Sequence, residues 1–239
     1  MSVEFEVVDD PARACAALMV SAAIGGGEIV LAGGNTPKAA YAHFVDTVRA
    51  VGLDLDATTF WLGDERCVDP DDERANFRMI SESLVDPLRG ITPVDVRRIR
   101  GELGPVEGAD DYDRQLGERE PRDFDLVLLG IGPDGHTASL FPGQATLNER
   151  RRLAVAVPEA GLEPFVPRVS LTVNALSAAQ RIVFLASGAA KADAIAEAFG
   201  PNADADPAIP ASLFVPEAKL VTVLLDHAAA AGLNGEAPR

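Results

Sequence analysis

The sequence predicts an α/β fold: a single-domain, Rossmann-like layered structure with a mostly parallel central sheet flanked by helices. Apolar runs of strand length alternate with amphipathic segments of helix length along the whole chain. The connections are mostly short, which is typical of parallel strands joined by right-handed crossovers. Because no internal repeat and no linker poor in hydrophobic residues interrupts the alternation, we expect one domain over residues 1–239, with a loose tail at 232–239.

The predicted strands are short apolar runs bounded by glycine, proline or charged residues. The first alternates like an edge strand, whereas the run at 124–129 is almost continuously apolar and should be central and buried. In chain order the predicted strands are 3–8, 28–32, 58–62, 96–99, 124–129, 153–157, 168–172, 181–186 and 220–225.

The predicted helices show amphipathic spacing, and the first has Pro11 near its start and glycines at its end. A run that could start a further helix follows His136. The other helices are expected at 11–24, 38–51, 74–84, 106–116, 174–179 and 191–199.

Charge and hydropathy exclude several classes of protein. The chain has 37 acidic and 21 basic residues, so its formal net charge is -16 and it should repel nucleic acid and anionic membrane surfaces. No apolar run approaches the roughly 20 residues of a membrane-spanning helix, and residues 1–10 lack the order of a signal peptide. We therefore expect a cytoplasmic protein, and a monomer is compatible with the sequence.

The cysteines and histidines give no sign of a metal site. Cys15 and Cys67 lack CxxC spacing and metal-ligand neighbours, so we interpret them as free thiols of a reducing compartment. With only His43, His136 and His227 in the chain, a histidine-rich metal site is not indicated.

A glycine-rich segment at 33–37 follows the second predicted strand. Gly33 and Gly34 let the backbone turn sharply, Asn35 or Thr36 is expected to cap the next helix, and Pro37 suits its first position. Free N–H groups at that helix start would form an anion site. A tight turn with a good cap is an equally weighted alternative, and the absence of GxGxxG or a GK[ST] ending gives no indication of nucleotide binding.

A charged loop at 63–68 follows the third predicted strand. Arg66 could pair with Asp64 or hold a substrate oxygen in a forked geometry. The alternative is a solvated charge run, since an acidic stretch at 69–73 continues it.

The third loop, Asp134-Gly135-His136, follows the predicted central strand. A histidine near an aspartate at a strand end can act as a general base, since histidine titrates near neutral pH; a structural histidine bonded to a backbone carbonyl is the alternative. Lys191 and Arg168 are weaker candidates, for which a surface cation is the favoured reading when each is taken alone.

Taken together, the three loops predict an anion cradle, a charged loop and a histidine loop at one end of the sheet. The chain has neither a GxSxG elbow nor a Cys/His pairing signal, so acyl-enzyme chemistry is not favoured. Base-catalysed attack by water fits better.

These segments resemble the 6-phosphogluconolactonase family, which shares a fold with glucosamine-6-phosphate deaminase. The resemblance extends over nearly the whole chain. It is carried by residues 31–37, 63–68, 75–79 and 130–143, and by the later segments 168–172, 188–191 and 207–212.

The resemblance implies hydrolysis of 6-phospho-D-glucono-1,5-lactone to 6-phospho-D-gluconate in the oxidative pentose phosphate pathway. His136 would deprotonate the attacking water, Asp134 or Asp64 would hold the imidazole or order the loop, and Arg66 would stabilise the oxyanion together with backbone N–H groups. No metal or organic cofactor would be needed, because a lactone is already an activated ester. The expected phosphate site comprises Gly33, Gly34, Asn35, Thr36, Arg168 and Lys191.

Two alternatives stay open. Deaminases of this fold typically continue the Asp-Gly-His with Ile-Ala-Phe-Asn-Glu-Pro and have Asp-Glu-Tyr in the earlier loop. Here Thr-Ala-Ser-Leu-Phe-Pro-Gly follows His136, no acid precedes Glu149, and Arg66 replaces the tyrosine. A non-catalytic sugar-phosphate sensor is the second alternative, although we expect no DNA-binding segment because the chain is acidic and has little room before Val3.

Overall fold

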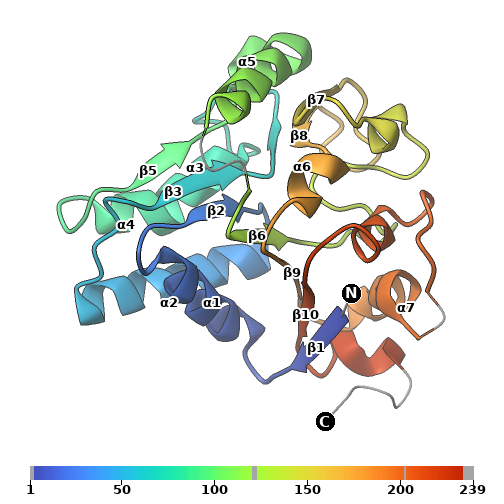
Figure 1. The fold of residues 1–239 in the computed structure, drawn as a ribbon, viewed down its shortest axis with the longest axis horizontal. Helices are drawn as coiled ribbons and strands as arrows, with labels where there is room; N and C mark the ends of the chain where they lie inside the picture. Colours follow the sequence, from blue (N-terminus) through green and yellow to red (C-terminus); the bar gives the residue numbers. More distant parts are fainter. Residues whose placement is uncertain (1–2, 120–122, 202, 234–239) are drawn as a thin grey trace.

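The computed structural model describes residues 3–119, 123–201 and 203–233 (Figure 1). Residues 234–239 of the predicted tail lie outside these ranges. Residues 232 and 233 end a short 3-10 helix, η6 (Ala229–Leu233), so the loose tail predicted from 232 begins too early.

The central sheet has seven strands, and every neighbouring pair is parallel, which confirms the predicted fold class. The strand order is β1-β10-β9-β6-β2-β3-β5. The strands are β1 (Val3–Val7), β2 (Glu28–Leu31), β3 (Thr59–Leu62), β5 (Asp95–Arg97), β6 (Leu126–Leu129), β9 (Arg181–Ala186) and β10 (Val221–Leu225).

The strand order reverses between β2 and β6. From β2 the chain builds outward through β3 and β5, whereas from β6 it builds the other way through β9 and β10. Helical crossovers leave such a pair in opposite directions, so a crevice opens beyond the two carboxyl ends. The glycine-rich segment follows β2 and the histidine loop follows β6, and both therefore lie at this crevice.

A second, three-stranded antiparallel sheet was not predicted. Its order is β4 (Asp64–Arg66), β8 (Arg168–Leu171) and β7 (Ala154–Val157). The chain changes sheet at Gly63, whose N–H donates to Leu31 O and whose carbonyl accepts from Leu171 N. The charged loop expected at 63–68 is thus partly a strand.

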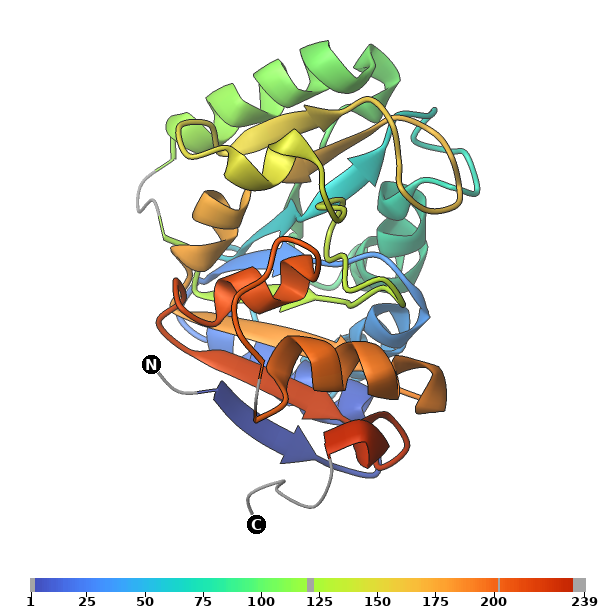
Figure 2. The same cartoon turned by 90° about the vertical axis from the view of Figure 1, so that its right-hand side faces the viewer.

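Helices cover both faces of the central sheet (Figures 1 and 2). On one face, α1 (Pro11–Ala23) and α2 (Asn35–Val51) lie side by side, next to α3 (Asn76–Ile80), the π-helical η1 (Ser81–Val85) and α4 (Asp86–Leu88). The second sheet with α5 (Pro105–Gly117), and then α6 (Val173–Ser177) and α7 (Ala192–Phe199), cover the other face.

Three helix predictions differ from the structure. The helix expected at 38–51 begins earlier, at Asn35. The helix expected at 74–84 begins at Asn76 and becomes π-helical at Ser81. Among the described residues, no helix begins directly after His136. Instead, Thr137 pairs with Leu140 in an isolated bridge, and Ala138 has a left-handed φ of 49°, which ends any helical continuation.

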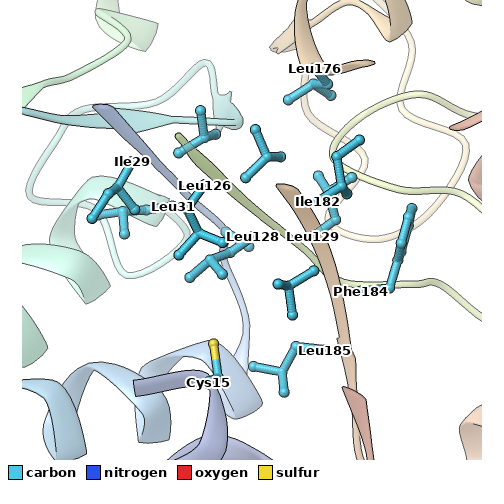
Figure 3. Close-up of a cluster of buried hydrophobic side chains, with 14 of the residues drawn as sticks. Cys15, Ile29, Leu31, Leu126, Leu128, Leu129, Leu176, Ile182, Phe184 and Leu185 are labelled. Carbon is cyan, nitrogen blue, oxygen red and sulfur yellow. The ribbon is translucent and has the colours of Figure 1, made fainter. Parts of the chain in front are cut away.

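The core lies on both faces of β6, β2 and β9 (Figure 3). β6 is buried at all four positions, as its continuous apolar run predicts. Cys15 of α1 packs in the same cluster with none of its surface exposed, and burial raises the pKa of its thiol to about 12. It is therefore a core residue with little nucleophilic character.

The two tyrosines of the chain hold the strand ends that lead into the crevice. Tyr41 OH donates to Ala32 O at 2.7 Å and accepts from Ala32 N at 2.9 Å. Tyr112 OH donates to Leu62 O at 3.0 Å and accepts from Leu62 N at 2.9 Å. Both hydroxyls are buried, so each satisfies backbone groups just before Gly33 or Gly63.

Removing either hydroxyl should therefore destabilise the fold. We expect Tyr41→Phe and Tyr112→Phe each to lower the free energy of unfolding by about 1–3 kcal/mol, because buried backbone groups lose a partner. Urea unfolding measures this. The matched control is Thr222→Val, since the buried Thr222 hydroxyl has no hydrogen-bond partner among the described residues and its loss should cost little. Equal effects for all three variants would contradict the assignment.

Candidate active site

The crevice is a cleft of about 500 Å³ at the carboxyl ends of β2, β3, β6 and β9. The loop residues Leu162 and Glu163 form a further part of its wall. Its lining includes all the predicted site residues except Asp134: Gly33, Gly34, Asn35, Thr36, Asp64, Arg66, His136, Arg168 and Lys191. The prediction that the three loops meet at one place is confirmed.

His136 and Asp134 form a hydrogen-bonded pair at the cleft. Nδ1 of the imidazole lies 2.5 Å from Asp134 Oδ1, and 14% of the His136 side chain is exposed. Burial raises the pKa of Asp134, but hydrogen bonds and charge from His136 outweigh burial and leave that pKa below its usual value. An ionised carboxylate can only accept, so Nδ1 carries the proton and Nε2 is the free acceptor.

Glycines make this geometry possible. A Cβ on Gly132 would lie 2.0 Å from His136 Nδ1 and 2.7 Å from Asp134 Oδ1, so any side chain there would displace the pair. Gly135 has φ +75°, and a Cβ there would lie 2.7 Å from the Ile209 side chain. The turn closes with a hydrogen bond from Gly132 N to His136 O at 2.8 Å.

The start of α2 faces the same cleft, but its cap differs from the prediction. Gly34 is the N-cap, with φ 106°, and no side chain of the described residues caps the helix. Asn35, Thr36 and Pro37 occupy its first three positions, so neither polar residue caps it and Pro37 is third. The uncapped N–H groups of Asn35 and Thr36 and the positive end of the helix dipole remain available to an anion.

Two arginines are direct cross-strand partners in the second sheet. Arg66 of β4 pairs with Arg168 of β8, a like-charge arrangement that is unfavourable without a counter-charge or an anionic ligand. Arg66 Nη1 donates to Arg74 O and Asn76 Oδ1, both at 2.8 Å. The guanidinium is thereby held at the cleft wall.

Arg168 is only 3% exposed, so the surface-cation interpretation is wrong. Its Nη2 donates to Leu162 O at 2.9 Å and Pro164 O at 3.1 Å. Burial lowers the pKa of Arg168, and nearby Asp64 partly opposes this. In this structure the Arg168 guanidinium adds positive charge at the cleft wall, and its Nη2 holds the loop of Leu162 and Pro164.

Asp64 does not bind the imidazole. Its Oδ2 accepts from Ser139 Oγ at 2.5 Å and its Oδ1 from Asn76 Nδ2 at 3.1 Å. Of the two aspartates considered, Asp134 holds the ring, whereas Asp64 ties β4 to the loop that follows His136.

Lys191 ends the short 3-10 helix η4 (Ala189–Lys191) and precedes α7. Its Nζ donates to Ile131 O at 2.7 Å and borders the cleft. Burial lowers the pKa of Lys191, while Asp134 opposes the shift. The side chain thus connects the β9 end of the cleft to the histidine loop.

Sequence reasoning missed the importance of Asn76 and Glu65. Asn76 bridges Arg66 and Asp64, and its side chain approaches Gly33 so closely that a Cβ there would lie 2.2 Å from its Oδ1. The Glu65 carboxylate accepts from the N–H groups of Arg66, Asn76 and Phe77 at 2.6–2.7 Å. Glu65 lies in the charged loop that the sequence singled out, but no signal there shows that it accepts from the start of a helix eleven residues later. Nothing marked Asn76 apart from its family segment.

No group of three or more His, Cys, Asp or Glu side chains within the described ranges is placed to hold a metal ion. The chemistry available at the cleft is that of the His136–Asp134 pair, the cations and the N–H groups of α2.

Comparisons with known proteins give the family and agree with the fold. Residues 6–223 match the family described as glucosamine-6-phosphate isomerases/6-phosphogluconolactonase. The chain is 32% identical over 242 residues to the 6-phosphogluconolactonase of Synechocystis sp., covering 96% of this chain and 95% of that protein. It is similar in structure to the 6-phosphogluconolactonase from Trypanosoma brucei, with a TM-score of 0.80, 27% identity and coverage of 96% and 98%. A monomeric glucosamine-6-phosphate deaminase has the same fold, with a TM-score of 0.82, 19% identity and coverage of 97% and 100%.

The buried Glu65 predicts a pH dependence of stability. Burial raises its pKa to about 7, and the three N–H donors only partly oppose this. Because the folded pKa lies above that of the unfolded chain, the favourable contribution is complete at pH values below the unfolded pKa and is lost as the pH rises through about 7.

We therefore expect the free energy of unfolding of the wild type, relative to Glu65→Gln, to fall as the pH rises from 5 to 8. Denaturant unfolding across this range measures the difference, and the exposed Glu82→Gln serves as the control. A wild-type minus Glu65→Gln difference that is constant with pH would refute the prediction.

Proposed function

The chain belongs to the family of glucosamine-6-phosphate isomerases and 6-phosphogluconolactonases, and from this premise we propose that it hydrolyses 6-phospho-D-glucono-1,5-lactone to 6-phospho-D-gluconate. This is the lactonase step of the oxidative pentose phosphate pathway. One observation supports the proposal most strongly: His136, which is paired with Asp134, lines the same cleft as the uncapped start of α2.

The substrate phosphate would bind at the start of α2. The backbone of Gly33 and Gly34 allows close approach, and the N–H groups of Asn35 and Thr36 donate to phosphate oxygens. Lys191 lines the same cleft and would add a charge-assisted hydrogen bond. Arg168 would act through its charge, because its Nη2 is committed to the loop carbonyls.

The chemistry needs one base and one site for negative charge. His136 Nε2 takes a proton from water as the water oxygen bonds to the lactone carbonyl carbon, while Asp134 stabilises the resulting imidazolium through Nδ1–H. Arg66 and backbone N–H groups stabilise the tetrahedral oxyanion. When the oxyanion collapses, the bond from C1 to the ring oxygen breaks, and the imidazolium returns the proton to that oxygen, giving a carboxylic acid and a hydroxyl. The carboxylic acid then ionises and releases its proton to solvent, which leaves the carboxylate product.

The deaminase reaction is the alternative for this fold, and the histidine loop argues against it. Residues 137–148 contain no carboxylate that could join a ring-opening proton relay with His136. The loop is instead tied to the second sheet through Ser139 and Asp64. The same cleft with no turnover would correspond to the second alternative, a sugar-phosphate sensor.

The setting of the enzyme is also a proposal. No helix within the described residues is long and apolar enough to cross a membrane. We propose that residues 1–239 act as one lactonase domain in the cytoplasm, as a monomer without a metal or organic cofactor. The free thiols Cys15 and Cys67 support a reducing compartment, and the net charge of -16 supports a protein without a nucleic-acid or membrane partner.

His136→Ala should remove the base and lower turnover of the fresh lactone by about 10²–10⁴-fold. Lactone hydrolysis measured above its spontaneous background tests this. His43→Ala is the matched control, because His43 lies on the surface near Asp10 and should be dispensable. Full turnover by His136→Ala would overturn the assignment.

Lys191→Ala should mainly weaken phosphate binding. We expect KM for the lactone to rise by about 10–100-fold, the equivalent of a hydrogen bond to a charged group, with a smaller change in kcat. Lys219→Ala, which removes an exposed lysine paired with Asp123, is the control. An unchanged KM with a reduced kcat would mean that Lys191 supports the histidine loop through Ile131 rather than binding phosphate.

A further inference from the structure

Phe141 is a buried aromatic residue that does not serve the main core. It is 1% exposed, yet it does not belong to the hydrophobic cluster that fills the core of the described residues. Its ring instead lies beside the polar groups of the cleft. A large apolar side chain in such a place needs an explanation other than core packing.

The ring of Phe141 packs against the imidazole of His136. The two ring centroids are 4.7 Å apart and their planes are tilted by 37°. The imidazole is thus held at two points, by Asp134 at Nδ1 and by Phe141 against the ring. The Asp134 contact alone leaves the ring free to swing about the hydrogen bond, whereas the packed aromatic ring restricts that motion.

Phe141 also contacts the buried guanidinium of Arg168. The Arg168 Cζ lies 5.2 Å from the Phe141 ring centroid, within the range of a cation–π interaction. Arg168 holds the loop carbonyls of Leu162 and Pro164, and Arg168 Nη1 lies 3.4 Å from Ser139 Oγ. The position of the Phe141 ring is therefore itself fixed by a group that has little freedom to move.

A third contact closes the arrangement. Gly161 passes so close to the ring that a Cβ there would lie 2.9 Å from Phe141 Cδ1. Gly161 immediately precedes Leu162 and Glu163, which form part of the cleft wall. Phe141 thus lies between the histidine loop and the loop that carries this wall, and it touches both.

We propose that Phe141 is a positioning residue, which holds the His136 imidazole in the orientation that presents Nε2 to the substrate. The proposal rests on the lactonase function proposed above. Phe141 does not border the cleft, so it acts through His136 and not by touching the lactone. Its loss should therefore slow the chemical step without weakening substrate binding, because a small misplacement of a catalytic group is costly.

Phe141→Leu tests the proposal, since it keeps an apolar side chain and removes the ring. We expect kcat for the lactone to fall by about 10–100-fold, with KM within about threefold of the wild type. Phe141→Tyr keeps the ring and should retain turnover within about threefold of the wild type. Phe141→Met supplies a second, flexible replacement if the leucine variant does not fold.

The control is Phe44→Leu, which truncates a fully buried phenylalanine that packs against Phe60 away from the cleft. It should lower the unfolding temperature and leave kcat unchanged. Suppose that the wild type and Phe44→Leu are both active. If Phe141→Leu or Phe141→Met then raises KM without lowering kcat, or changes neither constant, only the positioning role is overturned. A wild type without lactonase activity would overturn both this role and the proposed function.

Discussion

The parallel pairing of β2 with β6 is the constraint on which the site depends. Strand order reverses at this pair, so the two carboxyl ends open side by side into one crevice. The α2 helix starts directly after the turn that follows β2, and His136 lies in the turn that follows β6. The buried tyrosine hydroxyls and the glycines without room for a Cβ then keep these turns in place. A pairing of either strand with a different neighbour would separate the start of α2 from His136.

The second sheet solves an electrostatic problem. A chain with a net charge of -16 must attract a phosphorylated substrate, so the cleft needs local positive charge that exceeds the field of the whole molecule. The antiparallel pairing of β4 with β8 places Arg66 opposite Arg168, and Lys191 approaches from the end of β9. Asp64 and the loop carbonyls offset part of the cost of burying Arg168, and the same contacts stabilise the walls of the cleft. Charge and rigidity at this site thus come from the same interactions.

The central sheet could be predicted from the sequence because most of its strands are apolar and its helices amphipathic. The ends of β2, β3 and β6 located the three loops, and the loops supplied the candidate residues. The second sheet could not be predicted, because β4 consists of three charged residues without an apolar pattern, and nothing in β7 or β8 says which strands they pair with. The sequence could not say whether Asp134 or Asp64 holds the imidazole of His136. That choice depended on side-chain geometry, because the Asp64 carboxylate accepts instead from Ser139, 75 residues away in the sequence. The helix cap failed as a prediction because Gly34, with its left-handed φ, replaced the expected polar cap.

We propose that this cleft binds a sugar phosphate and directs water to a lactone, and that it does not open the ring of an amino sugar. The most direct test is to give the wild-type protein fresh 6-phospho-D-glucono-1,5-lactone and glucosamine 6-phosphate in parallel, and to measure acid release from the first and ammonia release from the second. We expect lactone hydrolysis well above the spontaneous rate and no release of ammonia. Ammonia release without accelerated lactone hydrolysis would contradict it.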